Sequence, residues 1–445
     1  MTKDLTAGHP FKIIFGFAVP VFFGCLFQQF YNLVDTIIVG RFLGVSALAA
    51  VGSTGSLNFM ILGFCMGICS GFAIPVAQRF GAKDFTGMRQ YVFNSGVLCV
   101  IFSVVLTVFA VIFCRQLLAL MNTPADIIDG AYAYFVIILA GIPVTILYNI
   151  LSGIIRSVGD SKTPLYFLIF SAGLNIVLDL VFIAVFNWGI PGAAYATVIS
   201  QGVAGVICLF FMHAKFEILR LQKEDKVVSS RRCRDLIGIG IPMGLQYSIT
   251  AIGSVILQSA VNVLGSVYVA SIATGTKISM FFTTPFDALG TTMATYGGQN
   301  VGAAKKERLN SGLFWACVIG FIYAGIGFLI LFFASTPLTQ LFMNKNEDAA
   351  TVALVAKNVR LFLLSNSSCY VLLALVNIVR FMIQGMGFSK VAIFAGAFEL
   401  VGRALIGVVF IPIVGFAAAC FASPLAWLFA DAFLIPTYFL CRKKL

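Results

Sequence analysis

The chain has 445 residues, of which 60% are hydrophobic and only 10% are charged, and its mean hydropathy is +1.01. A water-soluble protein of this length exposes far more charge, so this composition excludes a soluble globular fold. The formal net charge of +12 could suggest a nucleic-acid partner. However, the basic residues lie in short segments between apolar runs, which is a signal of membrane topology and not of nucleic-acid binding.

Long apolar runs with almost no charge follow one another along the chain, for example at residues 97–113 and 314–333. Runs of this length predict membrane-spanning helices, which satisfy their own backbone hydrogen bonds in lipid. A membrane β-barrel would need alternating segments of about ten residues, a pattern that these runs lack. We expect an all-α integral membrane protein with about twelve spans. The expected spans are residues 12–38, 46–77, 91–113, 127–150, 165–186, 190–212, 236–262, 267–297, 311–333, 351–379, 390–412 and 415–440.

The distribution of positive charge predicts the orientation of these spans. With the amino terminus placed inside, the expected inner segments hold 22 of the 29 lysines and arginines. The positive-inside rule then places both termini in the cytoplasm of a multi-pass protein of the cell membrane. Most of the eleven cysteines fall within apolar spans, and no Cys/His metal-ligand spacing occurs, so we expect no disulfide framework and no structural metal site.

The two halves of the sequence resemble each other. Residues 78–82 read Gln-Arg-Phe-Gly-Ala, and residues 299–303, 221 positions later, read Gln-Asn-Val-Gly-Ala. Three further matches occur in the same order, between residues 42–44 and 263–265, 149–162 and 377–390, and 189–197 and 415–423. We expect an amino-terminal six-helix lobe (1–214), a charged cytoplasmic linker (215–235) and a carboxy-terminal six-helix lobe (236–445). An even number of spans in each half makes the lobes parallel repeats, as in many alternating-access transporters. We expect Gly81 and Gly302 to end helices and to have a structural role, without contacting substrate.

One face of the first span carries polar side chains at helical spacing, namely Gln28, Tyr31, Asn32 and Asp35. A charged carboxylate at membrane depth costs about 2.5–3.5 kcal/mol, so Asp35 should face protein or water and is a candidate for a transport role. The alternative is a solvated carboxylate near the span end that pairs with Arg41. Pro20, upstream on the same span, removes a backbone hydrogen bond and permits a bend.

The fifth and sixth spans add oxygen-bearing side chains to this candidate site. Asn175 and Asp179 share one face of the fifth span, and Thr197 lies on the sixth. Together with Asp35 they could bind Na⁺ or a proton, while the alternative is a buried polar cluster that only holds helices together.

The acids were not duplicated, because the positions that align with Asp35 and Asp179 in the second half are Ile256 and Gly407. That half instead carries other charges at membrane depth, namely Lys277, Asp287, Glu399, Arg403 and Asp431. Glu399 and Arg403, four residues apart, should pair as a packing device. Lys277 and Asp287 are weaker candidates for lining a substrate cavity, since they lie about 15 Å apart along a helix and cannot form an ion pair.

Residues 159–163 read Gly-Asp-Ser-Lys-Thr but lack the upstream glycine of an ATP-binding loop, and no cytoplasmic stretch could hold a nucleotide-binding domain. Transport should therefore draw on an ion gradient or on a separate partner protein. No surface cluster of His, Asp or Ser suggests an enzyme, and no cofactor is expected.

Several motifs resemble the multidrug and toxic compound extrusion (MATE) transporters. They are residues 31–40 in the first span, 81–82, 156–164 and 299–303 in the cytoplasmic loops, and 174–179 and 192–197 in the fifth and sixth spans. The resemblance implies two lobes around a V-shaped cavity and export of amphipathic, often cationic drugs or metabolites in exchange for H⁺ or Na⁺. It implies small-molecule substrates in a lipid bilayer, and we expect a monomer. A related alternative is a flippase for lipid-linked precursors, which should line its cavity with several cations.

The resemblance also implies roles for single residues. Asp35 would be the principal coupling acid, with Asn175, Asp179 and Thr197 as co-ligands. Gln28, Tyr31, Asn32 and Asn149 would belong to the substrate cavity, with Lys277 and Asp287 as further candidates, and Pro20 would be the bend point. Some members bind a cation between carboxylates of the seventh and tenth spans. Here Gln246 lies in the seventh span and no acid lies between residues 361 and 379, so coupling through the amino-terminal lobe is favoured.

Overall fold

A computed structural model describes residues 2–121, 123–341 and 349–445, and every regular element in those ranges is helical. The elements of the first half are α1 (Pro10–Leu43), α2 (Val45–Ser53), α3 (Gly55–Gly81), α4 (Phe85–Ile112), α5 (Cys114–Leu120), α6 (Ile128–Ala140), α7 (Ile142–Ser157), α8 (Lys162–Asp179), the π-helix η1 (Leu180–Val185), α9 (Ile190–Lys215), and the short 3₁₀ turns η2 (Glu217–Leu219) and η3 (Lys223–Asp225). Those of the second half are α10 (Ser230–Asn262), α11 (Ser266–Gly302), α12 (Lys306–Gln340), α13 (Ala349–Ser368), α14 (Tyr370–Gly385), α15 (Ser389–Leu405), the π-helix η4 (Ile406–Phe410), α16 (Ile411–Val414), α17 (Phe416–Cys420) and α18 (Ala422–Lys443).

These helices confirm an all-α membrane fold. In the described ranges, nine helices are long and apolar enough to cross a bilayer, or eleven if each of two bent pairs is one span. The bent pairs are α6 with α7, at 47°, and α13 with α14, at 49°. The count by length and apolarity is therefore nine to eleven, below the expected twelve. Each expected span coincides with a helix or a helix pair, and α11 is the one that is too polar to be counted, since it carries Lys277, Asp287 and many threonines.

The chain forms two compact units. Unit 1 consists of Met1–Ala7, Phe23–Ser248 and Gly298–Lys305. Unit 2 consists of Gly8–Phe22, Ile249–Gly297 and Lys306–Leu445. The long helices α1, α10 and α11 each contribute to both units, so the units divide the chain elsewhere than at the expected boundaries of 1–214, 215–235 and 236–445. The division into two sequence lobes stays a prediction.

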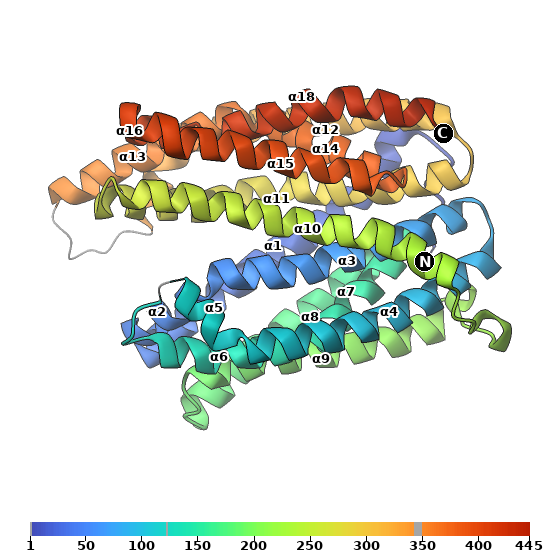
Figure 1. The fold of residues 1–445 in the computed structure, drawn as a ribbon, viewed down its shortest axis with the longest axis horizontal. Coiled ribbons are helices and arrows are strands. Elements are labelled where there is room, and N and C mark those ends of the chain that lie inside the picture. Colours follow the sequence, from blue (N-terminus) through green and yellow to red (C-terminus); the bar gives the residue numbers. More distant parts are fainter. Residues whose placement is uncertain (1, 122, 342–348) are drawn as a thin grey trace. The chain divides into compact units, whose positions relative to one another are not determined.

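Within unit 1, helices α3, α4, α6, α7, α8 and α9 pack side by side around a core of aliphatic and aromatic residues (Figure 1). The first part of α10 crosses α3 where both helices carry glycines at four-residue spacing, at Gly63, Gly67 and Gly71 on α3 and Gly240 and Gly244 on α10. A Cβ at Gly67 would lie 2.5 Å from the carbonyl oxygen of Met243, so only glycine allows this approach. Such small-residue crossings are typical of helix packing in membranes, where close van der Waals contact replaces the hydrophobic effect.

Unit 2 packs α12, α14, α15 and α18 closely against one another (Figure 1). A Cβ at Gly402 of α15 would lie 2.8 Å from the Cα of Ala426 on α18, and Tyr370 and Tyr438 are fully buried in this unit. Large apolar side chains such as Phe333 remain exposed, as lipid-facing surfaces require.

The expected linker, residues 215–235, is anchored to unit 1. Asp225 is buried and pairs with Arg89 of α4 at 2.5 Å. The Asn94 amide of α4 donates to the Val227 carbonyl at 3.0 Å and accepts from the Ser229 backbone amide at 2.9 Å. The segment therefore connects the halves along a fixed path on α4.

The structure repeats the sequence duplication in its turns. Left-handed glycines occur in matched pairs, at Gly44 and Gly265, Gly159 and Gly387, and Gly189 and Gly415. A π-helix interrupts the chain at equivalent places after α8 and α15. The glycines lie within the segments where the sequence halves match, and each π-helix lies shortly before the last of those segments, which supports duplication.

The glycines of the duplicated Gln-x-x-Gly-Ala motif end two helices, as expected, and also form a contact that the sequence did not predict. Gly81 and Gly302 are the last residues of α3 and α11, but the left-handed conformation falls on Lys83 and Ala304 instead. A Cβ at Gly81 would lie 2.0 Å from the carbonyl oxygen of Gln299, and a Cβ at Gly302 would lie 1.8 Å from that of Gln78. The two copies of the motif thus contact each other reciprocally, and each glycine is required for close approach and not for its φ angle.

The amino-terminal segment covers this reciprocal contact. The Leu5 backbone amide donates to Gln299 Oε1 at 2.9 Å, and Gln299 Nε2 donates to the Ser157 carbonyl at 2.8 Å. Lys305 Nζ donates to the Thr6 carbonyl at 2.8 Å. Residues 2–7, the end of α7 and the end of α11 are therefore held together by buried hydrogen bonds.

Asp4 is the acidic residue of this segment. Partial burial by itself raises the pKa of Asp4, but hydrogen bonds from Thr6 and the charges of Lys305 and Lys83 outweigh it, so the pKa is lowered overall from 3.8. Asp4 therefore stays ionised and contributes its stabilising contacts at neutral pH.

Candidate functional site

Helices α1, α8 and α9 bring the expected ion-site residues together in unit 1. Asp35 lies on α1, Asn175 and Asp179 lie on α8, and Thr197 lies on α9, where α8 and α9 pack along each other. Asp179 is fully buried and Asn175 is 1% exposed, while Asp35 and Thr197 are half-buried. Four residues spread over 162 positions thus form one polar cluster.

The two carboxyl groups face each other. The Asp35 and Asp179 side chains lie within hydrogen-bonding reach of one another, and in each carboxyl the Oδ1 atom is buried with no partner among the described residues. A carboxyl–carboxyl hydrogen bond forms only when one of the two groups carries a proton. The pair is therefore a place where a proton or another small cation can be held.

Asn175 connects the acid pair to α9. Its amide is oriented from the hydrogen-bond network, with the nitrogen donating to Asp179 Oδ2 at 3.2 Å and the oxygen accepting from the Thr197 backbone amide at 3.2 Å. Directly after Asp179, α8 gives way to the π-helix η1. π-helical turns inside helices often mark functional positions, because they re-aim neighbouring side chains.

Three neighbours of this cluster, namely Thr145, Gln201 and Tyr134, were not predicted from the sequence. Gln201 of α9 accepts a hydrogen bond from Thr145 Oγ1 of α7 at 2.9 Å, and the Tyr31 hydroxyl lies within hydrogen-bonding reach of Thr197 and Gln201. Tyr134 of α6 lies close enough to Asp35, Asp179 and Tyr31 to interact electrostatically with all three. Thr197 and Gln201 are four residues apart, so the helical spacing rule could have found Gln201, whereas nothing local distinguishes Tyr134.

The remaining expected residues of unit 1 lie near the cluster along the chain but differ in their contacts. Asn32 is exposed, Gln28 is half-buried, and Asn149 donates from its side chain to the Thr145 carbonyl of its own helix at 2.8 Å. Pro20 lies inside α1, which continues as one helix through it, and belongs to unit 2 while Asp35 belongs to unit 1. The substrate and bend roles of these residues stay predictions.

In unit 2, Lys277 and Asp287 are exposed on α11. The expected pair of Glu399 and Arg403 is present at 3.4 Å. Sequence reasoning placed Arg380 in an inner loop, but this residue lies within α14, is 5% exposed and donates to the other oxygen of Glu399. Arg380 was missed because the expected span ended at residue 379, although the apolar residues 381–383 continue the helix beyond the arginine.

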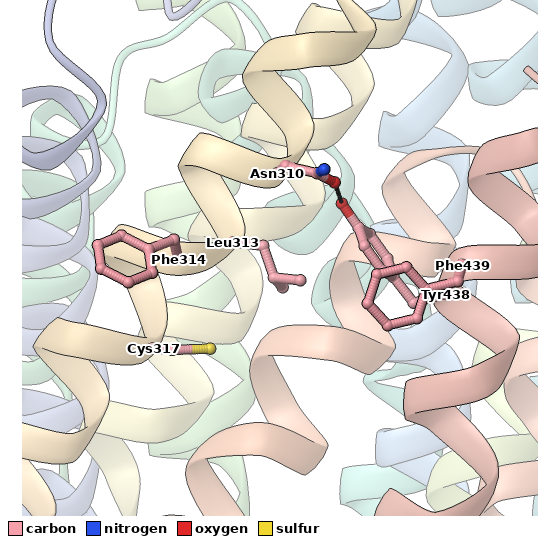
Figure 2. A pocket seen from close by; sticks show the side chains of 6 residues that line it. All are labelled: Asn310, Leu313, Phe314, Cys317, Tyr438 and Phe439. Carbon is pink, nitrogen blue, oxygen red and sulfur yellow. Dashed lines mark hydrogen bonds between the residues drawn. The ribbon is translucent and has the colours of Figure 1, made fainter.

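A shallow groove of about 330 Å³ lies between α12 and α18 in unit 2 (Figure 2). It is lined mainly by apolar side chains, and the Tyr438 hydroxyl donates to Asn310 Oδ1 at 2.9 Å across one end (Figure 2). None of the residues expected from the sequence lines it. The groove is therefore not a candidate for the ion or substrate site.

The chemistry available at the acid pair is that of oxygen ligands. No group of three or more His, Cys, Asp or Glu side chains in the described part of the chain could hold a metal ion. Carboxylate, amide and hydroxyl oxygens suit a proton or a hard monovalent cation and do not suit a transition metal.

Comparison with known proteins agrees with this picture. The MatE family profile matches residues 20–181 and 242–413, one stretch in each half. The probable multidrug resistance protein YpnP of Bacillus subtilis is 32% identical over 310 residues, which cover 69% of this chain and 68% of that protein. The FAD transporter of Shewanella oneidensis is 22% identical over 337 residues, or 74% of each chain. A solved outward-facing MATE family transporter of the MOP superfamily superposes with a TM-score of 0.92 at 24% identity, covering 100% of this chain and 99% of that one.

A duplicated helical membrane fold with an acid pair buried among its spans defines a multi-pass membrane transporter. The profile covers most of both halves, and the resemblance found in the sequence motifs is confirmed. The chain belongs to the MatE family of multidrug efflux transporters.

Proposed function

We propose that this protein is a secondary antiporter that exports amphipathic, often cationic drugs or metabolites in exchange for H⁺ or Na⁺. The observation that carries the proposal is the carboxyl pair of Asp35 and Asp179, buried in unit 1 with one unpartnered oxygen on each acid. Buried acids of this kind in a transporter are expensive to maintain, so they indicate an ion path.

Asp35 is the proposed coupling acid, with Asn175, Asp179 and Thr197 as its co-ligands. The contact between the two carboxyl groups favours a proton, because like charges at this distance repel unless one group is neutral. A sodium ion would use the same oxygens, together with the Asn175 amide and the Thr197 hydroxyl. The name of the MATE family does not decide between the two ions.

Substrate and ion compete for one cluster in this proposal. Tyr31 touches both Thr197 and Gln201, so movement of α1 changes the same contacts that hold the acid pair. Gln28, Asn32 and Asn149 would contact substrate beside Tyr31, and Lys277 and Asp287 would contribute from α11. Binding of a cation to the acids and binding of a cationic substrate then oppose each other, which is the coupling that antiport needs.

Alternating access in this proposal opens and closes the reciprocal contact between Gly81 and Gly302. With both termini placed in the cytoplasm, that contact and the amino-terminal segment lie on the inner side, and they are formed in this structure. The protein would act as a monomer in the cell membrane, without a cofactor.

A flippase for lipid-linked precursors is the second candidate, and the YpnP relative, a probable multidrug resistance protein, does not favour it. A pyrophosphate-bearing substrate needs several free cations. Within the described ranges, the arginines deepest in unit 2, Arg380 and Arg403, both donate to Glu399, and Lys277 is the exposed cation of α11.

The test is Asp35→Asn in full-length protein reconstituted into vesicles, with export of a fluorescent amphipathic cation as the readout. Na⁺ and H⁺ gradients are imposed separately on vesicles of the parent and of the variant. The variant should lose the export that either gradient drives in the parent. Asp129→Asn, an exposed acid whose side chain pairs with Arg115 at 2.9 Å, is the matched control and should transport normally. Export at the parental rate in Asp35→Asn vesicles would refute the proposal.

A further inference from the structure

A second group of charged side chains is buried in unit 2, whereas Asp35 belongs to unit 1. Arg380 of α14 and Arg403 of α15 both donate to Glu399 of α15, each to a different carboxylate oxygen. Asp431 of α18 belongs to the same neighbourhood, since it interacts electrostatically with Arg380 and Glu399. The exposed fractions of Arg380, Glu399, Arg403 and Asp431 are 5%, 3%, 7% and 3%. Helices α14, α15 and α18 pack directly on one another, so these four groups form one buried cluster.

The cluster is only partly hydrogen-bonded. Neither carboxyl oxygen of Asp431 has a partner among the described residues, and Arg380 Nε and Arg403 Nη1 are also unpartnered in that part of the chain. The triad of Arg380, Glu399 and Arg403 could serve as packing, because each oxygen of Glu399 accepts a hydrogen bond from one of the arginines. Asp431 does not fit that explanation, since a buried carboxyl that bonds to nothing costs free energy and holds no helix in place.

The groups that face Asp431 come from several helices. They are Arg380 of α14, Glu399 of α15 and Cys317 of α12, while Asp287 of α11 interacts with Arg380. The Asp287 side chain is exposed, and an exposed carboxylate at membrane depth is tolerated only where water reaches it. Among these groups, Asp287 is therefore the one that water reaches.

The four buried groups balance when all are ionised, since two arginines face Glu399 and Asp431. The exposed Asp287, which interacts with Arg380, adds one negative charge. One added proton makes these five groups neutral together. A sodium ion fits less well, because it needs several oxygen ligands and the oxygens of Glu399 already accept from guanidinium groups.

We propose that this cluster is a second proton-binding site, with Asp431 as the group that holds the proton and Asp287 as its contact with water. The proton adds to a carboxylate oxygen of Asp431 to give the neutral acid, and the charge of the four buried groups and Asp287 together changes from −1 to 0. Arg380, which interacts with both acids, is the positioning residue between them. This site is separate from Asp35 and does not depend on which ion drives export.

The test is infrared spectroscopy of the full-length protein in lipid nanodiscs, following the C=O stretching band of protonated buried carboxyl groups as pH is changed. Asp431→Asn should remove one component of the band, and Asp35→Asn should remove a different one. Asp129→Asn, at an exposed position in the first turn of α6, should leave the band unchanged. A band in Asp431→Asn that matches the parental band at every pH overturns the proposal.

Two further measurements keep the result decisive. If Asp431→Asn does not fold, Asp431→Glu retains the acid and should shift the frequency of the same component, while an unshifted band refutes the assignment. Adding NaCl in place of KCl at constant pH should have no effect on this component. Its loss on Na⁺ addition would show a sodium site and contradict proton binding.

Discussion

Replacing Gly302 by alanine should disrupt the reciprocal contact between the two Gln-x-x-Gly-Ala motifs. The new Cβ would lie 1.8 Å from the Gln78 carbonyl oxygen and 2.6 Å from its carbonyl carbon. A carbon–oxygen contact tolerates no less than about 3.3 Å, so the two backbones must separate by roughly 1.5 Å. Both atoms that the new Cβ would meet belong to the backbone of Gln78, so no side-chain rotation can relieve the clash.

The cost follows from what that separation breaks. Overpacking of this kind costs about 1–3 kcal/mol. The Gln299 hydrogen bonds to Leu5 and Ser157, at 2.9 and 2.8 Å, would lengthen beyond bonding range, and each contributes about 1 kcal/mol. A total of about 3 kcal/mol shifts the closed–open equilibrium roughly a hundredfold towards the open form.

Hydrogen–deuterium exchange of the amino-terminal segment measures this shift directly. The backbone amides of Lys3 and Leu5 donate to Val158 and Gln299 when the contact is closed, so their exchange should be slow in the parent. In Gly302→Ala the protection of a peptide covering residues 2–8 should fall about a hundredfold, and Gly81→Ala should behave alike. Gly96→Ala on α4, where an added Cβ meets nothing within 4 Å, is the control and should keep full protection. Unchanged protection in Gly302→Ala, or an equal loss in the control, would show that the contact does not close the segment.

Two other outcomes follow from ion pairs and from Asp4. Arg380→Gln should destabilise the protein by about 3–5 kcal/mol in thermal unfolding, because it breaks a buried ion pair. Arg115→Gln removes an exposed ion pair and should cost about 0–1 kcal/mol. Equal melting temperatures of the two variants would contradict this prediction. Because the pKa of Asp4 is lowered below 3.8, protection of residues 2–8 should be constant at neutral pH and fall as pH drops below that value. Asp4→Asn should abolish the pH dependence once intrinsic exchange rates are corrected for, and a pH dependence that persists in the variant would assign it to another group.

The acid site illustrates how much a helical pattern predicts. The spacing of Tyr31 and Asp35, and of Asn175 and Asp179, predicted a shared face on each of two helices, and the structure places those faces together. Tyr134 could not be predicted in this way, because its helix, α6, shows no polar stripe and reaches the site through packing against other helices, α9 among them.

Gly81 and Gly302 show what a sequence pattern does not predict. Sequence comparison found Gly81 and Gly302 as repeated residues, but their position at helix ends suggested a turn, and the left-handed residues are Lys83 and Ala304. A sequence records that glycine is present without recording whether φ or a neighbouring backbone requires it. Only the approach of Gln78 and Gln299 from the other copy of the motif decides that question.

The sequence by itself determined the membrane environment, the helical class, the duplication and the confinement of Asp35 and Asp179 to the first half, because these follow from apolar run length, charge and repeat spacing. Tertiary structure decided which partner each polar group meets. Glu399 has a local partner in Arg403, four residues away, yet it also binds Arg380 from α14, while Asp431 is left without a hydrogen bond. Partner choice among buried charges depends on distances between helices that are remote in the sequence, and no local pattern encodes those distances.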